Sequence, residues 1–108
     1  MNRGDIVIVV AQGDYGKPRP AVIIQSDLFN ATHGSILVCP ITSDPLDAPL
    51  FRLTLEPTPE NGLKHPSQIM VDKILTLRQD RIRNKIGVLD SETIKLLNRA
   101  LMIFIGLV

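Results

Sequence analysis

Short apolar runs, separated by prolines and glycines, restrict this chain to a fold built mainly from strands. The first run, residues 6–10, is apolar throughout, which is typical of a strand buried on both faces. Residues 21–24 and 36–41 follow as a second and a third strand. Pro40 lies inside the third run and cannot donate to a ladder, so that strand is predicted to be at an edge, bulged or near its end there.

Two later segments are expected to extend the sheet. Residues 51–55 alternate, which predicts that Phe51, Leu53 and Leu55 point inward and that Arg52 and Thr54 point outward. Residues 68–77 are predicted as a single strand with Gln68, Met70, Asp72, Ile74 and Thr76 on one side. Residues 85–89 add a short final strand, and residues 56–66 form a long loop.

Helical spacing appears at the C-terminal end. Asp90 or Ser91 can cap a helix whose apolar stripe is Ile94, Leu97, Leu101, Phe104 and Val108. The last turns are apolar nearly all round, so its own sheet or another chain must cover them. A shorter helical turn is expected at residues 26–30, with Ser26 or Asp27 as its cap. Strands followed by one helix predict an α+β, mainly β fold: a small barrel with a packed helix.

Composition limits the chain to one domain over residues 1–108 and to few classes of partner. The chain is 44% hydrophobic and 21% charged, which is typical of a globular protein. Its net charge of +1 requires any nucleic-acid site to concentrate its basic residues on one face. Cys39 is the only cysteine, and the N-terminus lacks the features of a signal peptide, so a cytoplasmic protein is expected.

Several kinds of chemistry find no support in the sequence. His33, Cys39 and His65 have no metal-ligand spacing, and no nucleotide-binding glycine motif or nucleophile elbow is present. No metal or cofactor is therefore expected. An acid–base pair of His33 and His65, both in predicted loops, is a minor alternative for RNA cleavage.

Arg19 is the first candidate for a functional residue. It stands between Pro18 and Pro20, which restrict its backbone to extended geometry at the entry to a strand. A planar guanidinium suits two oxygens of a phosphate or a carboxylate. The alternative is a solvated or structurally paired arginine, which the residues alone favour.

Two further candidates follow in the chain. Thr42 and Ser43 stand at the predicted end of the third strand, where their hydroxyls either face a ligand or only form a turn. Asp72 lies in a predicted strand, where aspartate is disfavoured. It either pairs with an arginine or the backbone, or takes a proton or orients an arginine in a site.

The motifs "RGDIVIVV", "GKPRPAVIIQSD", "VCPITS", "SQIMVDKILTL" and "IGVLDSETIKLLNRALMIFIGL" together resemble the PemK/MazF family of toxin endoribonucleases over nearly the whole chain. The resemblance implies an SH3-like β-barrel of five to seven strands with a C-terminal helix, acting as a homodimer. It also implies metal-independent, sequence-selective cleavage of single-stranded messenger RNA, and neutralisation by a cognate antitoxin whose flexible tail occupies the RNA groove.

The resemblance assigns the catalytic roles to Arg19 of "RP", Thr42 of "ITS" and the acidic residue Asp72. Cleavage would proceed by attack of the 2′-hydroxyl on the adjacent phosphate. Arg19 would stabilise the charge that develops, and Thr42 would donate a hydrogen bond. Asp72 would act as the base or aim Arg19. The candidates for RNA contacts are Lys17, Pro20, Ser43, Gln68, Lys73 and Asp14.

The chain departs from the family pattern in its first loop. Many members carry His-Glu-Gln or Ser-Glu-Gln there, whereas this chain has the shorter "AQGDYGKP", in which Asp14 can replace the glutamate. Some members carry an arginine where this chain has Met70. We expect loops 11–18, 44–49 and 56–66 to select the RNA bases at the cleavage site.

A gyrase-poisoning toxin of the same fold is the alternative function, although such toxins typically end in an aromatic tail and this chain ends "IFIGLV".

Overall fold

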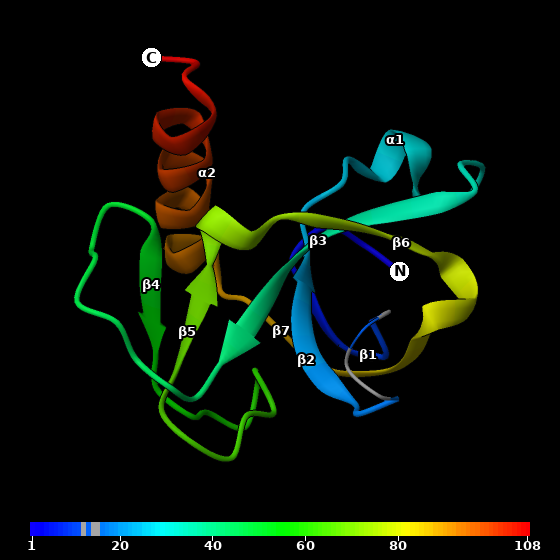
Figure 1. Cartoon of the computed structure of the whole chain (residues 1–108), viewed down its shortest axis with the longest axis horizontal. Helices are drawn as coiled ribbons and strands as arrows, with labels where there is room; N and C mark the ends of the chain where they lie inside the picture. Colours follow the sequence, from blue (N-terminus) through cyan, green and yellow to red (C-terminus); the bar gives the residue numbers. More distant parts are fainter. Residues whose placement is uncertain (12, 14–15) are drawn as a thin grey trace.

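The computed structural model describes residues 1–11, 13 and 16–108. In this part of the chain, seven strands form one antiparallel sheet and a C-terminal helix stands against it (Figure 1). The elements in chain order are β1 Asp5–Val9, β2 Arg19–Ile23, α1 Asp27–Asn30, β3 Ser35–Thr42, β4 Arg52–Leu55, β5 Ser67–Met70, η1 Val71–Lys73, β6 Leu75–Arg78, η2 Gln79–Arg81, β7 Ile82–Val88 and α2 Ser91–Ile105. The expected mainly β fold with a C-terminal helix is confirmed, although the sheet does not close into a complete barrel.

Strand β3 is the centre of the sheet. The strand order is β4-β5-β3-β2-β1-β7, and β6 pairs with β3 as well. The first half of β3 pairs with β6, from Ser35 opposite Arg78 to Val38 opposite Leu75. The second half pairs with β5, where Thr42 is opposite Gln68. Strand β3 therefore changes partner midway along its length.

Pro40 lies where this change of partner occurs. The ladder with β6 ends at Val38, and the ladder with β5 begins at Ile41, while β2 pairs on the other side through Ala21 opposite Pro40. Of the three positions predicted for Pro40, the edge is wrong because β3 is central, whereas a place near the strand's end agrees with a β3 that ends at Thr42. Proline is tolerated there because it falls in the gap between two ladders, where no partner on that side needs its missing N–H.

The predicted single strand over residues 68–77 is also wrong. It divides into β5 and β6, which are separated by the short 3₁₀ turn η1. Asp72 therefore lies in a turn, where aspartate is common, and the expected alternation of side chains ends at Met70. The division follows from the change of partner, since two short strands in succession cover one long neighbour.

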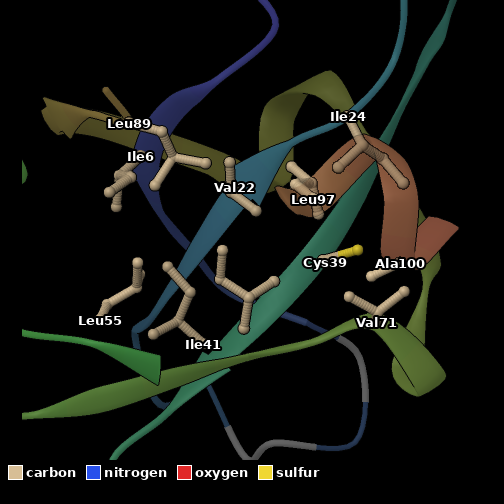
Figure 2. Close-up of a cluster of buried hydrophobic side chains, with 11 residues drawn as sticks. Ile6, Val22, Ile24, Cys39, Ile41, Leu55, Val71, Leu89, Leu97 and Ala100 are labelled. Atoms are coloured by element: carbon tan, nitrogen blue, oxygen red, sulfur yellow. The ribbon is translucent and has the colours of Figure 1, made fainter. Parts of the chain in front are cut away.

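The central strands are buried on both faces, as the continuous apolar runs predict. Alternate residues enter two separate cores, so that Ile6 belongs to one and Val7 to the other. Figure 2 shows the first core, in which Leu97 and Ala100 of α2 lie with Cys39 and Val71. Helix α2 closes this core.

Helix α2 begins at the predicted cap, but it ends at Ile105, before Val108 of the predicted stripe. The Asp90 carboxylate accepts a hydrogen bond from the Thr93 N–H at 2.7 Å, and Gly106 ends the helix in the left-handed conformation. Phe104 contacts Phe51 with ring centroids 5.7 Å apart.

Much of the apolar surface of α2 stays exposed: Leu96 is 54% and Ile105 55% exposed. Within the described residues, no helix combines the length and apolar character needed to cross a membrane.

Loop 56–66 is held against β7 by close backbone contacts. The Val88 N–H donates to the Glu60 carbonyl at 2.9 Å. The buried Asn61 side chain accepts from the N–H groups of Thr58 and Leu63, each at 3.0 Å. Gly87 packs so closely that an added Cβ would lie 2.3 Å from the carbonyl carbon of Asn61. The loop thus has a fixed path toward the start of β5.

We expect Gly87→Ala to destabilise the fold, because the Cβ atom has no room against backbone atoms that cannot rotate away. Overpacking of this kind costs about 2 kcal/mol, which would be seen as a lower midpoint in thermal denaturation. Gly34→Ala is the matched control, since nothing lies within 4 Å of its Cβ position. Equal midpoints for the two variants would contradict the close packing of loop 56–66 on β7.

Candidate functional site

Arg19 and Thr42 come together where β2 and β3 begin and end. Ala21 is opposite Pro40, Val22 opposite Cys39 and Ile23 opposite Val38. Continuing this register by two residues places Arg19 next to Thr42. Both residues also line the same two cavities. Two candidates chosen from separate motifs thus share one place in the fold.

The first cavity, here called the loop-side cavity, has a volume of about 480 Å³. It is bounded by β2, by the segment after β3 and by loop 56–66. Its polar and charged lining consists of Arg19, Thr42, Ser43, Asp44, Lys64, His65 and Ser67. Pro20 lines it as well. This cavity combines cationic, hydroxyl and imidazole groups, which are the groups expected around a phosphodiester.

The second cavity, the strand-side cavity, lies on the other side of Arg19 and Thr42 and has a volume of about 310 Å³. Its lining is mostly apolar and includes Pro40 and Met70. Lys73 adds a single ammonium group. A mostly apolar pocket lined by an arginine and a lysine has the groups that suit a nucleobase and its phosphate.

Asp72 forms an ion pair with Arg52. The Arg52 Nε donates to Asp72 Oδ1 at 2.7 Å and its second guanidinium nitrogen donates to Oδ2 at 3.2 Å. The side chains are only 9% and 18% exposed, respectively, so the predicted outward position of Arg52 is wrong. These hydrogen bonds lower the pKa of Asp72 and raise that of Arg52.

The ion pair decides what Asp72 can do. A carboxylate with a lowered pKa is a weaker base, and Asp72 lines neither cavity. Its neighbours Met70 and Lys73 do line the strand-side cavity. Of the alternatives that the sequence leaves open, pairing with an arginine is what the structure shows. Arg52 fixes η1 and thereby the position of Lys73.

The other residues predicted to contact RNA divide into four groups. Ser43 and Pro20 line the loop-side cavity, and Lys73 lines the strand-side cavity. Gln68 is buried, with its amide bonded to both the N–H and the carbonyl of Leu46, so it fastens the segment after β3. Lys17 is exposed and lines neither cavity. Asp14 lies outside the described residues.

The structure separates the two histidines. His33 precedes the start of β3, whereas His65 precedes β5, which pairs with the end of β3. Seven residues of strand span about 23 Å, so the two side chains cannot act as a pair. The hypothesis of a His33–His65 pair is wrong. His65 itself lines the loop-side cavity together with Lys64. The sequence indicated these two residues only through the prediction that loop 56–66 helps to select bases.

Within the part of the chain that the structure describes, neither Cys39 nor a metal-binding cluster belongs to this site. Cys39 is buried in the first core, and burial raises the pKa of its thiol to about 12, so it is inert as a nucleophile. Within residues 1–11, 13 and 16–108, no three His, Cys, Asp or Glu side chains gather in a way that could hold a metal ion.

We expect Asp72→Asn to lower the free energy of unfolding by about 2 kcal/mol near neutral pH, because it removes charge-assisted hydrogen bonds to a mostly buried guanidinium. The folded-state pKa of Asp72 is lowered, so its stabilisation is complete above the ordinary carboxyl pKa and is lost as the pH falls through the lowered value. In urea denaturation, the difference between wild type and variant should therefore shrink as the pH is taken below about 4.

Asp80→Asn provides the matched control for Asp72→Asn. Asp80 also pairs with an arginine, Arg78, but their side chains are 59% and 76% exposed. An exposed pair of this kind contributes roughly 0–1 kcal/mol. If the two variants lose the same stability at every pH, the Arg52–Asp72 pair does not stabilise the fold in the way described.

Comparison with known proteins identifies the family. Residues 2–105 match the family described as PemK-like, MazF-like toxin of type II toxin-antitoxin system. The chain is 44% identical over 108 residues to the probable endoribonuclease MazF of Mycolicibacterium smegmatis, and the alignment covers 99% of this chain and 98% of the relative. It is 28% identical over 112 residues to the endoribonuclease EndoA of Bacillus subtilis, with 100% and 97% covered.

Solved structures agree on the fold. An endoribonuclease in complex with its cognate antitoxin from a mycobacterial species matches with a TM-score of 0.85 at 20% identity, covering 100% of this chain and 97% of that one. A MazE–MazF structure from Deinococcus radiodurans matches with a TM-score of 0.80 at 20% identity, covering 98% and 95%. As the sequence resemblance implies, the chain belongs to the PemK-like, MazF-like toxins of type II toxin–antitoxin systems.

Proposed function

We propose that this toxin cuts single-stranded RNA, and messenger RNA in particular, at the site formed around Arg19 and Thr42. The family and its two relatives named as endoribonucleases support an endoribonuclease. They do not favour the gyrase-binding alternative. The observation that supports this location is that Arg19 and Thr42 border both cavities. A strand of RNA can then pass from one cavity to the other with a phosphate held between them.

The reaction uses the RNA's own 2′-hydroxyl and needs no metal. The 2′-oxygen loses its proton and bonds to phosphorus while the bond from phosphorus to the 5′-oxygen breaks. The leaving oxygen takes up a proton. The products are a 2′,3′-cyclic phosphate and a 5′-hydroxyl. Arg19 places a permanent positive charge where the phosphorane becomes more negative, and Thr42 donates a hydrogen bond to a phosphate oxygen.

Asp72 contributes to this site by holding Arg52 and thereby η1. The bidentate contact between the two side chains joins β4 to the turn that carries Lys73. Lys73 then reaches the RNA backbone from the strand-side cavity. Asp72 is thus a positioning residue, and a rate lost in Asp72→Asn would arise through Lys73.

The remaining RNA contacts follow from the lining of the cavities. Ser43 and Pro20 meet the nucleotide in the loop-side cavity. Gln68 acts indirectly by fastening the segment after β3 through Leu46. Lys17 and Asp14, both in the first loop, are the remaining candidates for RNA contacts. Single-stranded RNA is favoured because its bases can turn outward into pockets, which a duplex does not allow.

We expect Arg19→Ala to abolish cleavage of a long single-stranded RNA in the presence of EDTA, under conditions where the wild-type protein cleaves it. Removing one group that stabilises transition-state charge typically costs 10²–10³-fold in rate. Arg78→Ala is the matched control, because Arg78 is also an exposed strand arginine but lines neither cavity. Absence of cleavage by a folded wild-type protein in EDTA would refute the proposed reaction.

We also propose that the toxin acts in the cytoplasm as a homodimer bound by a cognate antitoxin. A structural neighbour is itself described as being in complex with its cognate antitoxin. The antitoxin's flexible segment would occupy the two cavities and exclude RNA. A second copy of the chain would cover apolar surface on α2 and on the segment before β4, where Leu50 is 65% exposed. Between these elements lies a cavity of about 230 Å³ lined by Leu50, Leu96 and Ile103.

Sedimentation at micromolar concentration should show a dimer, and Leu96→Glu should shift it toward monomer because a carboxylate would be buried without a partner. Leu28→Glu on α1 is the matched control, since Leu28 is also an exposed apolar helix residue, at 83% exposure. It should remain dimeric. A wild-type monomer at that concentration would contradict the proposed assembly.

A further inference from the structure

We propose that His65 transfers a proton during RNA cleavage by this chain, whose first loop has neither the His-Glu-Gln nor the Ser-Glu-Gln of many family members. The inference rests on the proposed function. Its basis is that loop 56–66 brings His65 into the lining of the same cavity as Arg19 and Thr42. No motif in that loop identifies it as part of the site.

The titratable groups that border the two cavities leave few candidates for proton transfer. Among the described residues these groups are Arg19, Asp44, Lys64, His65 and Lys73. Arginine and lysine keep their protons at neutral pH, and an aspartate keeps its negative charge. Only a histidine readily both donates and accepts a proton between pH 5 and pH 8.

Asp72, the other acidic residue expected to act, is already engaged. Its two carboxylate oxygens accept hydrogen bonds from Arg52, its pKa is lowered by that contact, and it lines neither cavity. His65 lines the loop-side cavity, so it is better placed than Asp72, which is paired with Arg52, to transfer a proton.

The loop gives His65 a defined position, which proton transfer requires. Gly62 has a φ of +68°, and a Cβ there would lie 2.1 Å from the Ile86 carbonyl oxygen. Asn61 binds the loop's own backbone, including the Leu63 N–H. The Ser67 hydroxyl donates to the His65 carbonyl at 2.8 Å. His65 is thus fixed from both sides along the chain.

Three other charged groups line the loop-side cavity with His65, and they come from three separate segments. Arg19 lies on β2, Asp44 lies in the segment after β3, and Lys64 precedes His65 in its own loop. Two cations and one anion therefore line the cavity that His65 lines. This arrangement holds the polyanionic substrate beside a group that can exchange a proton with it.

His65 acts in one of two balanced steps. As a base, its neutral imidazole takes the proton of the 2′-hydroxyl as the new bond to phosphorus forms. As an acid, the imidazolium gives a proton to the 5′-oxygen as its bond to phosphorus breaks. In both cases the products are the cyclic phosphate and the 5′-hydroxyl, and no oxidant or co-reactant is consumed.

The test uses a short single-stranded oligoribonucleotide that contains a cleavage site mapped with the wild-type protein, in EDTA. His65→Ala and His65→Gln should each lower the single-turnover cleavage rate about 100-fold. Binding of the same oligonucleotide with a 2′-deoxy sugar at the cleaved position should change little. His33→Ala is the matched control, at the far end of β3, and should cleave at the wild-type rate.

Two further measurements separate proton transfer from a structural role. One limb of the wild-type pH–rate profile should be absent in His65→Gln. It rises with pH if His65 is the base and falls if His65 is the acid. A substrate with a 5′-bridging sulfur needs no proton for its leaving group. The variants should recover most of their rate on it if His65 is the acid, and none if His65 is the base.

Cleavage by both folded His65 variants at the wild-type rate would overturn the inference while leaving the proposed function intact. A slower rate that comes with weaker binding and an unchanged pH profile would also overturn it, because His65 would then only hold RNA. Failure of the wild-type protein to cleave would instead remove the proposed function, and the inference with it.

Discussion

The change of partner along β3 is the constraint on which the rest of the structure depends. One strand of eight residues pairs with β2 on one side and, on the other, first with β6 and then with β5. Because β5 and β6 are consecutive in the chain, the turn η1 must lie where the change occurs. Pro40 fits at that point, since neither ladder needs a donor there. The change lets the sheet curve around two cores, and Lys73 of η1 then lines one cavity with Arg19 and Thr42.

The candidate site is a direct result of this geometry. Arg19 begins β2 and Thr42 ends β3, so the two residues meet at one end of these neighbouring central strands and line both cavities. The Arg52–Asp72 pair fastens η1 to β4 beside one cavity, and the backbone contacts of loop 56–66 with β7 form the wall of the other. The ion pair and the close backbone packing therefore hold in place the segments that line the two cavities. Proton transfer is then left to a group on the loop.

Much of the fold could be predicted from periodicity alone, because local pattern determines which residues are buried. The apolar runs and the cap at Asp90 needed no knowledge of distant partners, and Arg19 and Thr42 lie at the ends of elements that such patterns predict. The positions of Arg52 and Asp72 were harder to predict from the sequence. Alternation placed Arg52 outward and Asp72 in a strand, whereas a long-range ion pair and a change of strand partner decide both positions. The position of His65 depends on contacts between loop 56–66 and β7, which no local pattern encodes.

The central claim is that the site around Arg19 and Thr42 activates the RNA's own 2′-hydroxyl against the neighbouring phosphate. The chemical identity of the new RNA ends tests it most directly. Mass spectrometry of the fragments produced from a defined oligoribonucleotide should show a 2′,3′-cyclic phosphate on one fragment and a 5′-hydroxyl on the other. A 3′-hydroxyl paired with a 5′-phosphate would contradict the account, because those ends arise from attack by water and not by the 2′-oxygen.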